Sequence, residues 1–263
     1  RYLLATMCNL CQRYSYLTGK VMYKVDIPIL RNLKLTLENI CKLALEVGFD
    51  ACGTAPVRSL KEDAQYMDEW IAQGLHGNMS YLERNCDKRY NPAMLVPGAQ
   101  TVVVCLLSFA HSGRDYHRRV KSLLYSLEAK LKEHFGEEIV SATHQHIFCD
   151  SAPILERRWC VEAGLGFIGK NHQLIHPTLG SMVHPGEIVL NVPVLPDTSS
   201  RRYQEDTEKI EKGCADCSLC TDACPTGALR NEQWDATQCI AYTTHHCLEC
   251  QLPCPYNQLT TNI

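Results

Sequence analysis

Eight of the sixteen cysteines lie between residues 214 and 254, at spacings that suit iron–sulfur chemistry. The first four precede Pro225 and spell C-x-x-C-x-x-C-x-x-x-C-P: Cys214, Cys217, Cys220 and Cys224. In such a run three thiolates hold one 4Fe–4S cluster and the fourth reaches a second cluster. The remaining four, the last of which precedes Pro255, complete the pattern: Cys239, Cys247, Cys250 and Cys254. The spacing therefore predicts two 4Fe–4S clusters.

Cross-ligation between the two runs assigns four thiolates to each cluster. One cluster is expected to bind Cys214, Cys217, Cys220 and Cys254. The other is expected to bind Cys224, Cys239, Cys247 and Cys250. Structural zinc is the alternative, but four cysteines suffice for a zinc site and two interlocking sets are not needed. Crowded cysteines in an otherwise ordinary chain indicate metal binding in a reducing compartment, so we expect a cytoplasmic protein.

The bulk composition is that of a soluble globular protein. Of the 263 residues, 45% are hydrophobic and 21% are charged, and the net charge is -3. This charge provides no general attraction to nucleic acid, so any such binding must come from a local basic surface. No apolar run approaches the roughly 18 residues of a membrane span, and we expect no membrane partner.

The segments that must position the cysteines and their redox partner alternate between strand-like and helix-like patterns. Helical periodicity covers residues 33–47 and 120–135, and the ILERRWCVEAG segment also reads as a helix, closed by Gly164. Strand patterns cover residues 49–57, 101–109, 145–153 and 186–194. This alternation predicts a layered α/β domain.

Three regions follow from these patterns. Residues 1–29 are expected to be an N-terminal extension outside the native protein, with Met22 as a plausible start. Residues 30–204 form the α/β domain, whose end runs into the polar, linker-like segment PDTSSRRYQEDTEKIEKG. Residues 205–263 contain the cysteine-rich module. Because an electron carrier needs no large domain in front of its clusters, we expect that domain to use the electrons.

A glycine turn, EAGLGFIGKN, satisfies two nucleotide-binding patterns at once. Gly164, Gly166 and Gly169 form G-x-G-x-x-G, and residues 164–170 form G-x-x-x-x-G-K. The dinucleotide pattern requires a strand before the turn and a helix after it, whereas here a helix precedes and a strand-like segment follows. NAD and ATP are therefore weak alternatives to a helix C-cap followed by a tight turn.

Together these segments resemble the epoxyqueuosine reductase family, which carries out the last step of queuosine synthesis in bacterial tRNA. The resemblance covers about residues 48–257. It rests on HGNMSYLERNCDKRYNPAMLVPGAQTVVV, GRDYH, CDSAPILERRWCVEAGLGFIGKN, GSMVHPGEIVLNVPV, CADCSLCTDACPTGAL and CLECQLPCPYN. It implies a nitroreductase-like, cobalamin-binding α/β domain followed by a small ferredoxin-like domain with two 4Fe–4S clusters.

The resemblance also implies a reaction and its partners. The enzyme would remove the epoxide oxygen of epoxyqueuosine in tRNA with two electrons and two protons. Cobalamin would bind base-off, which agrees with Asp115-x-His117-x-x-Val120, where the glycine of histidine-ligating cobalamin proteins is absent. We expect an external electron donor of the ferredoxin or flavodoxin type, and a monomer. The rival functions are another corrinoid reductase resembling the reductive dehalogenases and a ferredoxin-type electron carrier.

Several residues match positions to which the family assigns a role. Asp150 matches the proposed proton donor, since burial in an apolar pocket would raise the pKa of such an acid; the alternative role is a helix N-cap. The implied cofactor-binding residues are Arg89, Asp150, Ser151, Gly169, Lys170, Asn171, Ser181 and Gly186. Candidate contacts to tRNA phosphates are Arg84, Lys88, Arg118, Arg119, Lys121 and Arg157, although such charges are commonly just solvated.

Overall fold

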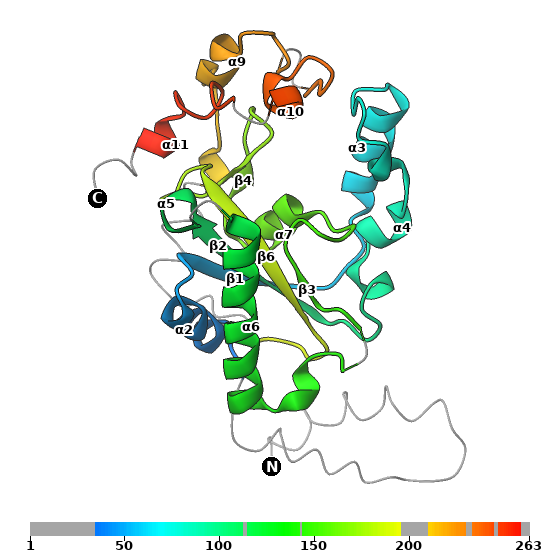
Figure 1. Ribbon diagram of the computed structural model, residues 1–263, viewed down its shortest axis with the longest axis vertical. Helices are drawn as coiled ribbons and strands as arrows, with labels where there is room; N and C mark the ends of the chain where they lie inside the picture. The colour runs from blue at the N-terminus through cyan, green and yellow to red at the C-terminus, as the bar shows by residue number, and fades with distance from the viewer. Residues whose placement is uncertain are drawn as a thin grey trace, which may run out of the picture. The chain divides into compact units, whose positions relative to one another are not determined.

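A computed structural model describes residues 35–112, 115–142, 144–195, 210–229, 233–244 and 247–258 (Figure 1). All of these residues belong to one compact unit, Leu33–Ile263, which contains both the sheet and the cysteine-rich segment. The predicted extension, residues 1–29, and most of the predicted linker lie outside the described residues. Within the described ranges, no helix combines the length and apolar character that a membrane crossing requires.

A four-stranded sheet is the centre of the fold. Its strands are ordered β1 (Ala51–Pro56), β2 (Thr101–Ser108), β6 (Val183–Leu190) and β3 (Ile147–Phe148). Every neighbouring pair is antiparallel. The continuous apolar run of β2 is buried because both faces of the sheet are covered. The predicted α/β class is thus confirmed as a mixed fold, although its main sheet is antiparallel.

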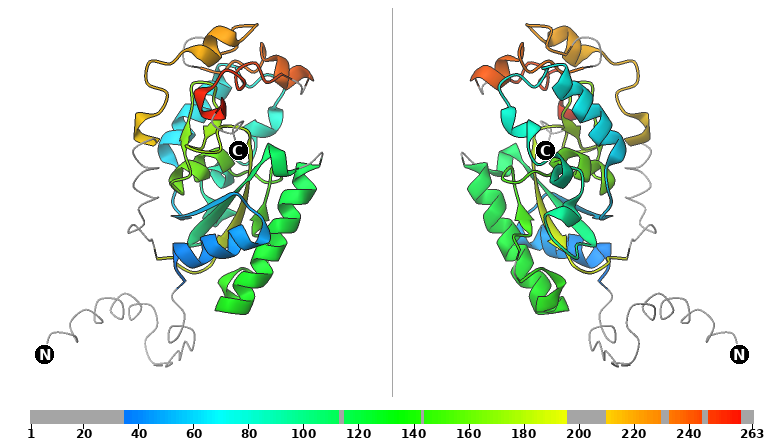
Figure 2. Two further views of the ribbon diagram at one scale, coloured as in Figure 1. Left: turned by 90° about the vertical axis from the view of Figure 1, so that its left-hand side faces the viewer. Right: turned by 90° about the vertical axis from the view of Figure 1, so that its right-hand side faces the viewer.

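Two hydrophobic clusters occupy the opposite faces of this sheet. On one face pack α2 (Leu37–Val47) and α6 (Tyr116–Phe135), against side chains such as Val103 and Ile188. On the other face packs α7 (Glu156–Glu162), against side chains such as Val104. Figure 2 shows α2 and α6 beside each other on their face of the sheet. The alternation of side chains along β2 and β6 therefore decides which residues face α7.

The predicted elements are found, but the strand expected over residues 186–194 lies earlier, at Val183–Leu190 of β6. Helix α2 ends at Gly48, whose φ is 109°, and Asp115 caps α6 by accepting a hydrogen bond from the Arg118 N–H at 3.1 Å. The strand expected over residues 145–153 contains only the two residues of β3. Helix α7 begins at Glu156 after Leu155, so the alternative role of Asp150 as its N-cap is wrong.

Shorter elements surround this framework. After β1 come α3 (Lys61–Ala72), η2 (Ser80–Glu83), α4 (Cys86–Arg89) and η3 (Pro92–Met94). The remaining elements are α5 (Phe109–Ser112), η4 (Glu137–Ile139), β4 (Phe167–Ile168), β5 (Leu174–Ile175), α9 (Leu219–Ala223), α10 (Ile240–Thr244) and α11 (Pro255–Gln258). The sequence periodicity gave no indication of α3, whose buried residue is Trp70.

Gly186 allows β6 and α6 to pack closely. A methyl group at this position would lie 2.6 Å from Val120 Cγ1 and 3.0 Å from Leu124 Cδ1. A side chain at this position would point into the core against α6. Gly186 lines neither of the two cavities described below. The structure therefore gives this glycine a packing role.

We predict that Gly186→Ala lowers the free energy of unfolding by about 1–3 kcal/mol, because it overfills a close-packed contact. Chemical denaturation of the purified protein measures the change. In the double variant with Val120→Ala, the new methyl group gains space, so the combined loss should be smaller than the sum of the single losses. Strictly additive losses would contradict the proposed contact.

Candidate active site

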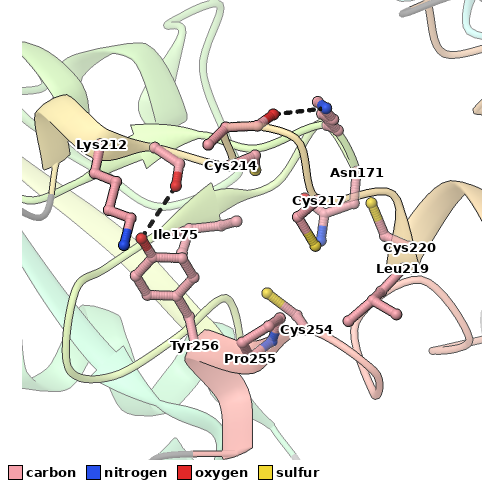
Figure 3. Close-up of a pocket in the computed structure, with 13 residues that line it drawn as sticks. Asn171, Ile175, Lys212, Cys214, Cys217, Leu219, Cys220, Cys254, Pro255 and Tyr256 are labelled. Carbon is pink, nitrogen blue, oxygen red and sulfur yellow. Dashed lines mark hydrogen bonds between the residues drawn. The ribbon is translucent and has the colours of Figure 1, made fainter.

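A cavity of about 380 Å³ is lined by the four cysteines of the first predicted set (Figure 3). These are Cys214, Cys217, Cys220 and Cys254. Cys220 and Cys254 are buried, whereas the other two are partly exposed. Three come from one segment and the fourth from the distant second run, which is the arrangement that the cross-ligation pattern predicts. We call this space the cysteine cavity.

The cysteine cavity gathers thiols without forming a closed metal site. A tetrahedral zinc site holds each sulfur about 2.3 Å from one point. Among the described residues, no three histidine, cysteine or acidic side chains converge on such a point. The cavity is also larger than one ion requires. Burial, followed by the charge of neighbouring thiolates, raises the pKa of Cys220, so a positively charged centre would stabilise the ligating form.

Three cysteines of the second predicted set also interact. Burial, and then the charges of Cys239, Cys220 and Cys247, raise the pKa of Cys250 to about 11. Because Cys220 belongs to the first set, its effect on the pKa of Cys250 indicates that the two sets of cysteines lie close together. Cys224 differs, because hydrogen bonds from the backbone and hydroxyl of Thr226 and nearby N–H groups outweigh the effect of burial and lower its pKa. That environment favours a thiolate, the form that binds metal.

The glycine turn forms part of a hairpin, not a nucleotide site. Gly164, with φ of 71°, follows the end of α7, and β4 then pairs antiparallel with β5. A side chain on Gly166 would collide with the Ile175 carbonyl group, so this crossing of the two chain segments requires glycine. The predicted helix cap and tight turn are confirmed, and the strand–turn–helix context of a dinucleotide site is not found here.

The turn at residues 168–172 lies between two cavities. Lys170 and Asn171 line the cysteine cavity, where the Lys170 ammonium donates to the Ala215 carbonyl at 2.8 Å. Ile168 and His172, on the same turn, line a second and larger cavity. We expected GLGFIGKN to line a cofactor pocket through Lys170 and Asn171, but the structure turns these two residues toward the cysteines.

The second cavity, of about 1040 Å³, is large enough for a bulky organic ligand and is here called the large cavity. Its walls come from α3, residues 79–89, residues 150–158 and Trp234 of the cysteine-rich segment. Trp70 stacks on Trp234 with ring centroids 5.7 Å apart, and its Nε1–H donates to the Trp234 carbonyl at 2.6 Å. These contacts join the cysteine-rich segment to the wall of the large cavity.

Asp150 lies at the edge of the large cavity in a strained backbone conformation. Its φ is 49°, in the left-handed region that is uncommon for residues with a side chain. The Tyr116 hydroxyl donates to Asp150 Oδ2 at 2.5 Å, and the Asp150 N–H donates to Glu156 Oε1 at 2.5 Å. Asp150 is exposed, so the apolar pocket expected around it is not present. Strain of this kind is concentrated at functional sites.

Two further acids lie near Asp150: Glu156 is partly buried and Glu187 is fully buried. Burial, and then the charge of Asp150, raise the pKa of Glu156 to about 8. Glu187 on β6 is fully buried, and neither of its carboxyl oxygens has a hydrogen-bond partner among the described residues. Burial and the charges of Glu156 and Asp150 raise its pKa well above the ordinary range. In both acids, removal from water therefore favours the protonated form.

Tyr116 belongs to a series of stacked rings. Its ring centroid lies 3.8 Å from that of His184 and 4.0 Å from that of His117, and His184 stacks in turn on Phe109 at 4.3 Å. Burial lowers the pKa of His184 to about 4, so this histidine is neutral at physiological pH. The stack fixes the tyrosine ring that donates to Asp150.

Of the other predicted cofactor-binding residues, some line the large cavity and others line neither cavity. Ser151 and Arg89 line the large cavity, but the Arg89 guanidinium donates to the carbonyls of Tyr81, Leu82 and Arg84 and so braces the wall segment. Ser181 and Gly169 line neither cavity. Of the predicted phosphate contacts, Arg84 and Arg157 reach the large cavity, and both are exposed.

Four residues that shape this site were not among the predicted functional residues: Tyr116, Glu156, Trp70 and Trp234. Tyr116 and Glu156 lie within the segments GRDYH and ILERRW, which carry the family resemblance, but that resemblance assigned no role to either residue. The two tryptophans lie far apart in the chain, and nothing in their local sequence indicates that they meet.

No family model matches the chain. It is 34% identical over 216 residues to the epoxyqueuosine reductase of Leadbetterella byssophila, covering 76% of this chain and 67% of the relative. It is 34% identical over 221 residues to that of Cyclobacterium marinum, covering 77% and 67%. A solved epoxyqueuosine reductase structure, in complex with an epoxyqueuosine-modified tRNA-Tyr stem loop, is 25% identical, with a TM-score of 0.69 over 84% of this chain and 65% of the other. The chain spans about two thirds of the length of these relatives.

Asn257 connects the second cysteine run to the α/β core. Its side chain accepts from the Ser181 N–H at 2.6 Å and donates to the Gln251 carbonyl at 2.7 Å and to Ser181 Oγ at 3.0 Å. Because Asn257 is buried, removing its amide leaves these partners unsatisfied.

We predict that Asn257→Ala lowers the free energy of unfolding by about 2–3 kcal/mol, from the lost bonds and unpaired groups. Thermal or chemical denaturation tests this value. Tyr256→Phe is the matched control, because it removes one bond of 3.1 Å to the Gly213 carbonyl and should cost about 1 kcal/mol or less. Equal losses in the two variants would contradict the anchoring role.

Proposed function

This chain belongs to the epoxyqueuosine reductase family, and we propose that it reduces the epoxide of epoxyqueuosine in tRNA to form queuosine. The observation that carries the proposal is the pair of adjoining cavities, one lined by cysteines and the other by Asp150 with its proton-holding neighbours. They share the turn at residues 168–172. An electron carrier alone would not need the large cavity, and the family relationship disfavours a dehalogenase-like substrate.

Two 4Fe–4S clusters and base-off cobalamin are the cofactors that we propose. The cysteine cavity and its four thiols support the first cluster, and the interacting thiols of Cys239, Cys247 and Cys250 support the second. The volume of the large cavity and apolar wall residues such as Met67 and Leu82 support a corrin ring. When bound, the clusters supply electrons singly and cobalamin supplies a metal centre that collects them at the epoxide.

The residues of the chain would provide position and protons. Asp150 would give a proton to the departing epoxide oxygen, and the Tyr116 hydroxyl fixes the orientation of its carboxyl group. Arg84 and Arg157, exposed at the large cavity, would contact the phosphates of the tRNA. Met67 and Trp70 would exclude water from the reacting face.

The domain assignment is proposed on the same basis: a nitroreductase-like domain over residues 30–204 and a ferredoxin-like domain over residues 205–263. An external donor of the ferredoxin or flavodoxin type would deliver the electrons. We propose that the protein acts as a monomer in the cytoplasm, where its tRNA substrate is found.

We predict that Asp150→Asn lowers epoxide reduction by at least about 10²-fold, because the amide cannot donate the required proton. The variant should keep normal corrin absorption and iron content. The measurement is the epoxyqueuosine content of tRNA after complementation of a strain that lacks its own reductase. Wild-type conversion by the variant would exclude the acid role. Failure of the wild-type chain to convert the base would exclude the proposed function.

We predict that Cys217→Ala lowers the iron content from about eight atoms per chain toward about four, because one cluster loses a ligand. Iron analysis of protein purified without oxygen measures this. Cys86→Ala is the control, since Cys86 lies on α4 and lines neither cavity. Equal iron contents in the two variants would contradict the assigned ligand.

A further inference from the structure

Asp150 and Glu156 form a hydrogen-bonded pair of acids at the wall of the large cavity. Both residues line that cavity, and the Asp150 N–H donates to Glu156 Oε1 at 2.5 Å. The interaction between the two carboxyl groups is one of the causes that raise the pKa of Glu156. Two carboxyl groups in contact can share a hydrogen bond only if one of them carries a proton.

The location of each acid identifies which one keeps that proton. Asp150 is exposed, and its carboxylate accepts a hydrogen bond from Tyr116. Glu156 is the first residue of α7 and is partly buried. Removal from water disfavours a charged carboxylate, so the proton of the pair belongs mainly to Glu156.

The surroundings of Glu156 contain more acids than bases. The titratable and charged groups that interact with it are Asp150 and Cys149 next to β3, Tyr116 of α6, Glu187 of β6, and Arg157 and Cys160 of α7. Glu187 points toward α7, because it alternates with Gly186, which faces α6. Glu187 has no hydrogen-bond partner among the described residues, so it is held neutral behind the pair.

We propose that Glu156 is a positioning and proton-relay residue, which passes to Asp150 the proton that Asp150 delivers to the substrate oxygen. This inference rests on the proposed function. The O–H of Glu156 transfers its proton to the Asp150 carboxylate, and Asp150 gives that proton to the departing oxygen. Glu156 is left as the carboxylate and is reprotonated from solvent. The step moves protons alone, and a second passage along the same route supplies the second proton, so that the oxygen leaves as water.

A purely structural role for Glu156 is the alternative, since its carboxylate also fixes the left-handed backbone of Asp150. Glu156→Gln separates the two roles. The glutamine amide oxygen can still accept from the Asp150 N–H, but an amide cannot relay a proton. Loss of the relay should therefore occur without loss of the loop conformation.

The kinetic experiment measures single-turnover reduction of a tRNA stem loop carrying epoxyqueuosine, across a range of pH. We expect the wild-type rate to fall above pH about 8, where Glu156 loses its proton. Glu156→Gln should be slower by about 10²-fold near neutral pH and should lack that decline. Glu162→Gln, on the same helix but lining neither cavity, should keep the wild-type rate and pH profile.

A second measurement needs no turnover. Infrared difference spectra of the holoprotein should show a protonated carboxyl group that ionises near pH 8 in the wild type and in Glu162→Gln, and that is missing in Glu156→Gln. The free energy of unfolding gives the same information. The raised pKa of Glu156 stabilises the folded protein at low pH, and this contribution disappears as pH rises toward about 8. That decline should be smaller in Glu156→Gln.

The outcomes are distinguishable. If Glu156→Gln keeps the wild-type rate and pH profile, the relay is overturned. In that case, inactivity of Asp150→Asn would still support the proposed function. If the wild-type chain reduces no epoxyqueuosine, the proposed function fails, and the infrared titration still shows whether Glu156 holds a proton. If Glu156→Gln does not fold, absence of an ionising carboxyl group from the wild-type spectrum overturns the inference.

Discussion

The crossing of the hairpin segments at Gly166 is the constraint on which both cavities depend. The backbone passes so close to the Ile175 carbonyl that no side chain fits at this position. The close crossing holds the turn at residues 168–172 with Lys170 and Asn171 toward the cysteines and Ile168 and His172 toward the large cavity. Because one turn contributes to both linings, the two cavities adjoin.

The cysteine-rich segment is held to the α/β core by buried polar contacts and by aromatic stacking. Asn257 ties its second run to Ser181, Lys170 ties its first run to the hairpin, and Trp234 stacks on Trp70 of α3. These contacts come from three different parts of the core. The segment therefore completes the wall of the large cavity as well as providing thiols.

Acidic side chains at the large cavity differ in their exposure. Asp150 is exposed at the cavity edge, while the partly buried Glu156 is the acid whose environment retains a proton. Side chains alternate along β6, so Glu187 lies on the face toward α7 while Gly186 allows α6 to pack closely on the other face. A proton donor that meets water and a proton store that avoids it can then lie in direct contact.

The sequence alone determined the spacing of the cysteines, most of the main elements and the family. Cysteine spacing is local, and the apolar periods of α2, β2 and α6 survive in the structure because they reflect which faces are buried. Only the tertiary structure decided that the sheet is antiparallel, that Gly186 packs in the core, and that Lys170 and Asn171 face the cysteines. It also identified Glu156 as an acid with a raised pKa, because burial and proximity depend on which distant segments pack together, and local patterns carry no information about that packing.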